Sequence, residues 1–183
     1  LSDSLKEQGK AYGVTIPWFI MTSEENNKDT VDFFAKNRFF GYEKDKNIFF
    51  FKQGQLPMVD TEGKILVGEN GLIKEAADGH GGIYEALVKN GMTQKMRELG
   101  VEWLFIGGVD NCLVKMVDPV LMGIAIQKQV TAAGKSVVKA NPKEKVGVFC
   151  KKNGRPSVVE YTEIPEEMAQ ATDERGELIF GES

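Results

Sequence analysis

Short apolar runs alternate along the chain with amphipathic stretches. Residues 16–21 (Ile-Pro-Trp-Phe-Ile-Met), 47–52 (Asn-Ile-Phe-Phe-Phe-Lys) and 103–106 (Trp-Leu-Phe-Ile) are almost continuously apolar. A run of this length predicts a strand that is buried on both faces, as in a parallel sheet. Three buried strands are therefore expected before residue 110.

Helical spacing fills the segments between and after these strands. We expect a helix over residues 27–36, with Thr22 or Ser23 as its N-cap. The apolar positions of residues 82–99 predict one continuous helix, and residues 119–131 predict another. Helices that follow strands in this order are typical of α/β folds.

Turn residues mark two hairpins. Residues 58–72 are expected to fold back at 61–63 (Thr-Glu-Gly), and Asn153-Gly154 is a turn that joins two antiparallel strands. The later strands are expected at residues 136–139, 146–150 and 158–161. We therefore predict one α/β domain with a mixed, mainly parallel sheet, at whose carboxyl edge ligands bind.

Composition narrows the class of protein. The net charge is −4 without a basic cluster, which argues against a nucleic-acid partner, and no apolar stretch reaches the ~18 residues of a membrane span. Cys112 and Cys150 lie in apolar runs without metal-ligand spacing, which favours free thiols in the cytoplasm. Because the chain begins at Leu1 and ends soon after an apolar run, we expect it to be part of a longer one.

A glycine-rich loop is the first candidate for chemistry. Residues 78–82 (Asp-Gly-His-Gly-Gly) lie between a predicted hairpin and a predicted helix start, and contain His80, the single histidine. Glycine backbone can approach a ligand closely, and N–H groups before a helix attract anions. The alternative is a loop whose glycines only make turns.

Polar residues after predicted strands are further candidates. Asp110 follows the 103–106 run and could hold a divalent metal, or simply cap the next segment. Gln53 follows the 47–52 run, and its amide could pair with a base edge or end the strand as a polar turn. Glu160 could accept from ligand hydroxyls, or face solvent.

Several motifs occur together in a fixed order. They are residues 16–23, 33–41, 53–57 (Gln-Gly-Gln-Leu-Pro), 78–82, 109–115, 118–119 and 158–164 (Val-Val-Glu-Tyr-Thr-Glu-Ile). This set resembles the eukaryotic-type UDP-N-acetylglucosamine pyrophosphorylases, over nearly the whole chain. The resemblance implies a Rossmann-like nucleotidyltransferase fold, a three-layer sandwich, of which residues 1–183 would be the central part.

The resemblance also implies an activity. UTP and a sugar 1-phosphate would give UDP-N-acetylhexosamine and pyrophosphate, with Mg²⁺ required. Gln53 and Gly79 match residues that contact uracil, and Asp110 matches the catalytic, metal-binding aspartate. The family's glycine-rich nucleotide loop would lie before residue 1 and further site residues after residue 183, so we expect the isolated chain to be inactive.

The sugar site is implied in the same way. Gly147, Glu160 and Tyr161 match residues near the sugar. His80 stands where the hexosamine enzymes usually have Asn, whereas UDP-glucose and broad UDP-sugar pyrophosphorylases commonly have His. Those enzymes remain an alternative, as does a non-catalytic module that binds nucleotide sugars.

Overall fold

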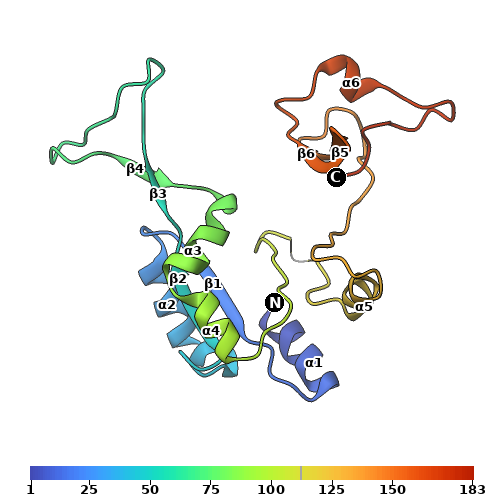
Figure 1. The fold of residues 1–183 in the computed structure, drawn as a ribbon. Helices are drawn as coiled ribbons and strands as arrows, with labels where there is room; N and C mark the ends of the chain where they lie inside the picture. The colour runs from blue at the N-terminus through green and yellow to red at the C-terminus, as the bar shows by residue number, and fades with distance from the viewer. Residues whose placement is uncertain (112) are drawn as a thin grey trace. The chain divides into compact units, whose positions relative to one another are not determined.

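The chain forms two compact units. The computed structural model describes residues 1–111 and 113–183, and it divides into Leu1–Asp118 and Pro119–Ser183. Each unit contains helices and strands, which confirms the α/β class (Figure 1). The first unit begins with α1 (Ser2–Tyr12).

A parallel pair of strands organises the first unit. β1 (Trp18–Thr22) and β2 (Ile48–Lys52) pair in register from Trp18 with Ile48 to Thr22 with Lys52. α2 (Asn27–Lys36) connects them and is followed by the short helix η1 (Arg38–Gly41). The first two predicted strands and the first predicted helix are therefore confirmed.

Helices cover both faces of this pair. Ile48 is fully buried with Phe34 and Tyr42 on the α2 side, and Phe51 packs with Leu87 and Met96 on the other side. Because alternate side chains of a strand point to opposite faces, β2 contributes to both clusters. This burial explains why its sequence is a continuous apolar run.

The helix expected over residues 82–99 is two helices. After the short helix η2 (His80–Gly82), α3 (Ile83–Lys89) and α4 (Met92–Glu98) are separated by Asn90-Gly91. Gly91 has φ 72°, a left-handed conformation that interrupts a right-handed helix. The prediction of one continuous helix was therefore wrong, although its outer limits were close.

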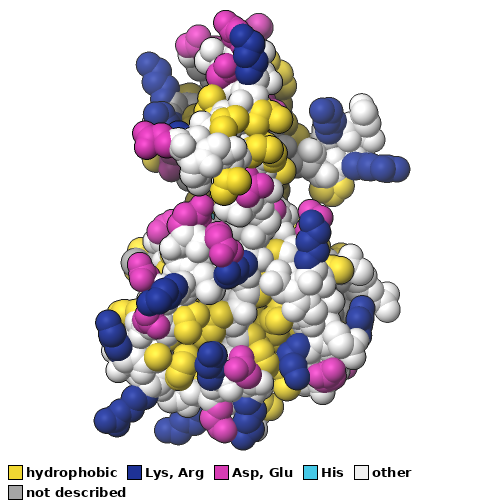
Figure 2. Space-filling view, turned by 90° about the vertical axis from the view of Figure 1, so that its left-hand side faces the viewer, with side chains coloured by type: hydrophobic (Ala, Val, Ile, Leu, Met, Phe, Trp, Pro, Cys, Tyr) yellow, Lys and Arg dark blue, Asp and Glu magenta, His cyan; other side chains and the backbone are white. Residues whose placement is uncertain are grey.

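An antiparallel arm projects from the first unit. β3 (Gln55–Pro57) pairs with β4 (Glu75–Ala77), and single bridges join Val59 to Ile65 and Val67 to Ile73 between them. The turn expected at 61–63 is confirmed, since Gly63 N–H donates to Asp60 O at 3.1 Å. Apolar side chains are exposed among charged ones (Figure 2), and on the arm the most exposed are Leu56 at 60% and Leu72 at 66%.

Residues 103–106 are not a strand in this structure. Leu104 and Ile106 are 49% and 46% exposed, and among the described residues no ladder of hydrogen bonds joins this segment to a neighbour. A strand is stable only when another strand satisfies its backbone groups. Of the three strand pairs in the described chain one is parallel and two are antiparallel, so the expected mainly parallel sheet is not seen.

The second unit is built on one hairpin. Its elements are α5 (Pro119–Gln127), β5 (Val148–Lys152), β6 (Arg155–Val159) and α6 (Glu166–Gln170). Asn153 and Gly154 have φ of 53° and 78°, as in the tight turn expected there. The strand expected at 136–139 is reduced to a bridge between Val138 and Glu182. Across the described residues, no helix is long and apolar enough to cross a membrane.

Candidate functional site

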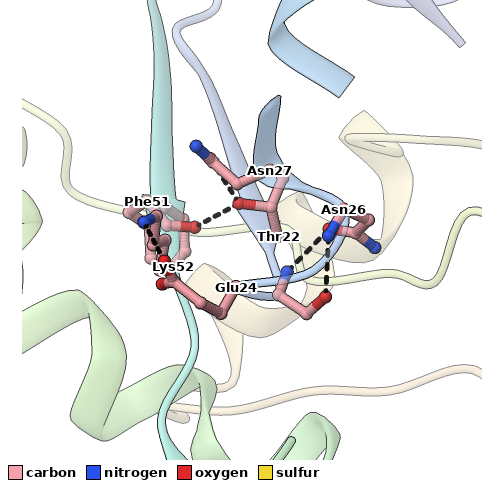
Figure 3. Close-up of polar contacts among 7 residues, drawn as sticks. Thr22, Glu24, Asn26, Asn27, Phe51 and Lys52 are labelled. Carbon is pink, nitrogen blue, oxygen red and sulfur yellow. Dashed lines mark hydrogen bonds and ion pairs between the residues drawn. The ribbon is translucent and has the colours of Figure 1, made fainter. Parts of the chain in front are cut away.

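The carboxyl ends of β1 and β2 hold Gln53 in place. Thr22 is only 4% exposed, and its hydroxyl donates to Asn27 Oδ1 at 2.8 Å (Figure 3). The Thr22 hydroxyl oxygen also lies 3.2 Å from Phe51 O. Gln53 N–H donates to Thr22 O at 2.8 Å. One buried threonine therefore joins the start of α2, the end of β2 and the backbone of Gln53.

The turn after β1 closes on itself. Ser23 N–H donates to Asn26 Oδ1 at 2.8 Å, and Asn26 N–H donates to Ser23 Oγ at 3.2 Å (Figure 3). The N-cap of α2 is Asn26, so Thr22 and Ser23 do not cap the helix directly as expected. They stabilise the turn that precedes it, because each side-chain oxygen satisfies a group in this loop.

The glycine loop begins opposite Gly54. Asp78 N–H donates to Gly54 O at 3.1 Å, which extends the β3–β4 pairing to the residue next to Gln53. The structure therefore brings Gln53 and Gly79, the two residues expected at uracil, onto neighbouring segments. Gly79 is exposed and has φ 83° and ψ 179°, a conformation open essentially to glycine alone.

His80 lies at the first position of η2 and is exposed. Among the described residues, no hydrogen bond or ion pair involves its imidazole. Its ring is therefore available to a ligand, as the functional interpretation requires, and equally to solvent.

Asp78 is the residue that the sequence interpretation missed. Its carboxyl group fills the space where side chains on Gly54 and Gly82 would begin. The signal available in the sequence was an acid directly before three closely spaced glycines, Gly79, Gly81 and Gly82. No pattern of spacing relates Gly54 to Gly82, since they are brought together by the β3–β4 pairing.

Asp110 lies in a turn after the extended segment and is exposed. In the described part of the chain its carboxylate has no hydrogen bond or ion pair, and nowhere do three His, Cys, Asp or Glu side chains gather as a metal site. One free carboxylate suits Mg²⁺, which binds one or two carboxylates and takes phosphate and water oxygens as its other ligands. Cys112, two residues on, lies outside the described residues.

The expected sugar residues of the second unit lie at the hairpin. A side chain on Gly147 would begin 2.9 Å from Val158 Cγ1 and 3.4 Å from Glu160 Oε1, so the structure brings Gly147 and Glu160 together. Glu160 follows β6 rather than lying inside a strand, and its carbonyl accepts from Glu163 N–H at 2.9 Å. Tyr161 is 44% exposed.

The sequence model of one family matches residues 3–181. Its description is UTP–glucose-1-phosphate uridylyltransferase. The chain belongs to this family.

Curated members of the uridylyltransferase family are similar to the chain over most of its length. UDP-N-acetylglucosamine diphosphorylase 2 of Arabidopsis thaliana is 40% identical over 176 residues, which cover 95% of this chain and 35% of that protein. UDP-N-acetylglucosamine pyrophosphorylase of Saccharomyces cerevisiae is 38% identical over 175 residues, covering 95% and 36%. The chain therefore spans about a third of the length of these relatives, and the resemblance seen in its motifs is confirmed.

A solved structure of a uridylyltransferase relative has the same fold. The uridine diphosphate N-acetylglucosamine pyrophosphorylase of Trypanosoma brucei superposes with a TM-score of 0.83 at 33% identity, over 97% of this chain and 36% of that one. A UDP-glucose phosphorylase of the same organism, at 19% identity, has a TM-score of 0.76 and supports the fold alone.

Proposed function

We propose that the full-length protein is a uridylyltransferase that makes UDP-N-acetylhexosamine and pyrophosphate from UTP and a sugar 1-phosphate. Its catalytic domain would be a Rossmann-like three-layer sandwich, to which residues 1–183 contribute the central part. The observation that supports this most directly is the placement of Gln53 and Gly79 on neighbouring segments, joined by Asp78 N–H and Gly54 O at 3.1 Å.

In this proposal the base binds at the end of β2. The Gln53 side chain offers both a donor and an acceptor, which a pyrimidine edge requires. The Gln53 backbone N–H donates to Thr22 O at 2.8 Å, so the side-chain amide extends from a backbone of fixed position. Gly79 presents backbone without a side chain, which lets the base approach closely.

Asp110 is proposed to hold Mg²⁺ near the phosphates. An oxygen of the sugar 1-phosphate attacks the α-phosphorus of UTP in line, a new P–O bond forms, and the bond to the β-phosphate breaks to release pyrophosphate. Bound Mg²⁺ supplies neutralisation of the phosphate charge. The exposed Asp110 carboxylate has no competing partner among the described residues, which suits this role.

In the second unit, the sugar would be bound by Gly147, Glu160 and Tyr161. Gly147 leaves room beside the Glu160 carboxylate, since a side chain there would begin 3.4 Å from Glu160 Oε1. A carboxylate accepts hydrogen bonds from two sugar hydroxyls at once. His80, in the first unit, would donate one hydrogen bond from its ring to the ligand.

UDP-glucose or a broad range of UDP-sugars is the second candidate product, and His80 is the observation that favours it.

The free Cys150 is compatible with a reducing compartment, and we propose the cytoplasm.

Pyrophosphate release by the full-length protein tests the proposal. The assay contains UTP, Mg²⁺ and one of three sugars: the 1-phosphate of N-acetylglucosamine, N-acetylgalactosamine or glucose. We expect release with a hexosamine 1-phosphate and none with UTP alone. Release that is faster with glucose 1-phosphate selects the second candidate. A folded protein that binds UDP-sugars but releases no pyrophosphate would instead be a binding module.

A further inference from the structure

Asp78 joins two segments that approach the proposed base site. It follows β4 directly, and its N–H donates to Gly54 O at 3.1 Å. Gly54 is the neighbour of Gln53, and Gly79 is the neighbour of Asp78. The backbone of Asp78 therefore lies between the two residues proposed to contact uracil.

The carboxyl group of Asp78 lies between Gly54 and Gly82, and its volume leaves no room for a side chain at either position. A side-chain carbon on Gly54 would collide with Asp78 Oδ2 and lie 3.2 Å from its Cγ, and one on Gly82 would collide with all three atoms of the carboxyl group. Gly82 has φ −63° and ψ −11°, which any residue can adopt. The lack of space beside Asp78, and not the backbone conformation, therefore excludes a side chain at position 82.

The same carboxyl group is incompletely satisfied. In the described part of the chain, Asp78 Oδ1 is buried and has no hydrogen-bond partner. Leaving a carboxylate oxygen buried in this way opposes folding. Oδ1 therefore adds no hydrogen bond among the described residues, whereas the carboxyl group as a whole fills the space beside Gly54 and Gly82.

We propose that Asp78 is a positioning residue that determines base specificity, by separating residues 53 and 54 from Gly82 at the end of the glycine loop. The inference rests on the proposed function, because it assumes that Gln53 and Gly79 contact the base. The carboxyl group sets the distance between the two segments by filling the space between them. A site that reads a base through hydrogen bonds discriminates only while its groups stay in place.

Four variants of the full-length protein test this. Asp78→Ala empties the space, whereas Asp78→Asn keeps a group of the same shape without the charge. Gly82→Ala forces the native carboxyl group to move, and Asp78→Ala/Gly82→Ala lets the new methyl group take its place. Gly81→Ala, made with and without Asp78→Ala, is the matched control, because a side chain at Gly81 would meet nothing within 4 Å.

The measured quantity is the ratio of kcat/KM for UTP to that for CTP. We expect Asp78→Ala and Gly82→Ala each to lower the ratio on the order of tenfold, and Asp78→Asn to preserve it. General weakening of the fold would affect both nucleotides alike. Gly82→Ala should have a smaller effect once Asp78 is Ala, whereas Gly81→Ala should have the same effect in both backgrounds.

Two results would overturn the proposal. One is an unchanged ratio in Gly82→Ala, and the other is an Asp78→Asn variant that loses selectivity as Asp78→Ala does. If the wild-type protein forms no UDP-sugar, the proposed function fails. The role of Asp78 is then decided by isothermal titration of the same variants with UTP and with CTP.

Discussion

Replacement of Thr22 by Val tests whether one buried hydroxyl holds the end of the parallel strand pair. Thr22 is 4% exposed, and its hydroxyl donates to Asn27 Oδ1 at 2.8 Å. Val has nearly the same shape, so the substitution removes the hydroxyl without leaving a cavity. The backbone bond from Gln53 N–H to Thr22 O remains possible in the variant.

The expected cost follows from what the hydroxyl satisfies. A hydrogen bond of this kind contributes about 0.5–1.5 kcal/mol net, and a buried acceptor left without a partner costs about 1–3 kcal/mol. Asn27 is only half-buried, so water can replace part of the lost bond. We therefore expect a loss of ~1 kcal/mol, which raises the population of the locally open state about fivefold.

Hydrogen exchange of the full-length protein measures this opening. Peptides that contain the ends of β1 and β2, including the Gln53 amide, should exchange about fivefold faster in Thr22→Val. Thr61→Val is the control, because Thr61 is exposed and its hydroxyl has no hydrogen bond among the described residues. Asn27→Ala should accelerate the same peptides, and the two effects should not add.

If these peptides exchange at the same rate in Thr22→Val and in Thr61→Val, the Thr22 hydroxyl does not hold the ends of the two strands. Strict additivity of Thr22→Val and Asn27→Ala would show that the hydroxyl acts independently of the Asn27 side chain.

Three further predictions concern single side chains. Asp110→Ala in the full-length protein should lower kcat about 10³-fold with little loss of folded protein, and near-normal turnover at saturating Mg²⁺ would contradict the metal role. His80→Asn should change the kcat/KM ratio between glucose 1-phosphate and N-acetylglucosamine 1-phosphate about tenfold; an unchanged ratio in both His80→Asn and His80→Ala would assign sugar choice elsewhere. Burial raises the pKa of Tyr42, so the tyrosine ionises first in the unfolded chain and stability falls as pH rises above about 10. The fall of Tm with rising pH should therefore be smaller in Tyr42→Phe than in the wild-type protein. Equal curves of Tm against alkaline pH for the two proteins would show that Tyr42 does not cause the fall.

Much of the local structure of both units could be predicted from sequence patterns. The continuous apolar run of β2 reflects burial on both faces, and the amphipathic spacing of α2 reflects one buried side. The turn at Asn153-Gly154 was predicted because few residues adopt positive φ. These signals lie within a few residues of one another, so sequence alone carries them.

The candidate site was only partly accessible in this way. Gln53, Gly79 and Asp110 were predicted from their positions after predicted strands and in a glycine loop, together with the motifs of a known family. Asp78 was not identified, because its role depends on Gly54 and Gly82, which are 24 and 4 residues away. The Asp78 carboxyl group comes to lie beside both glycines only when β3 and β4 pair.

Pairing and packing also decided the remaining differences. Residues 103–106 have the composition of a buried strand, yet a strand requires a neighbour that satisfies its backbone, and among the described residues no ladder of hydrogen bonds joins this segment to one. Glu160 and Gly147 are 13 residues apart and become neighbours because the hairpin brings their ends together. Local composition therefore determined which segments could form strands and helices, whereas contacts between distant segments determined which of them did and which side chains meet.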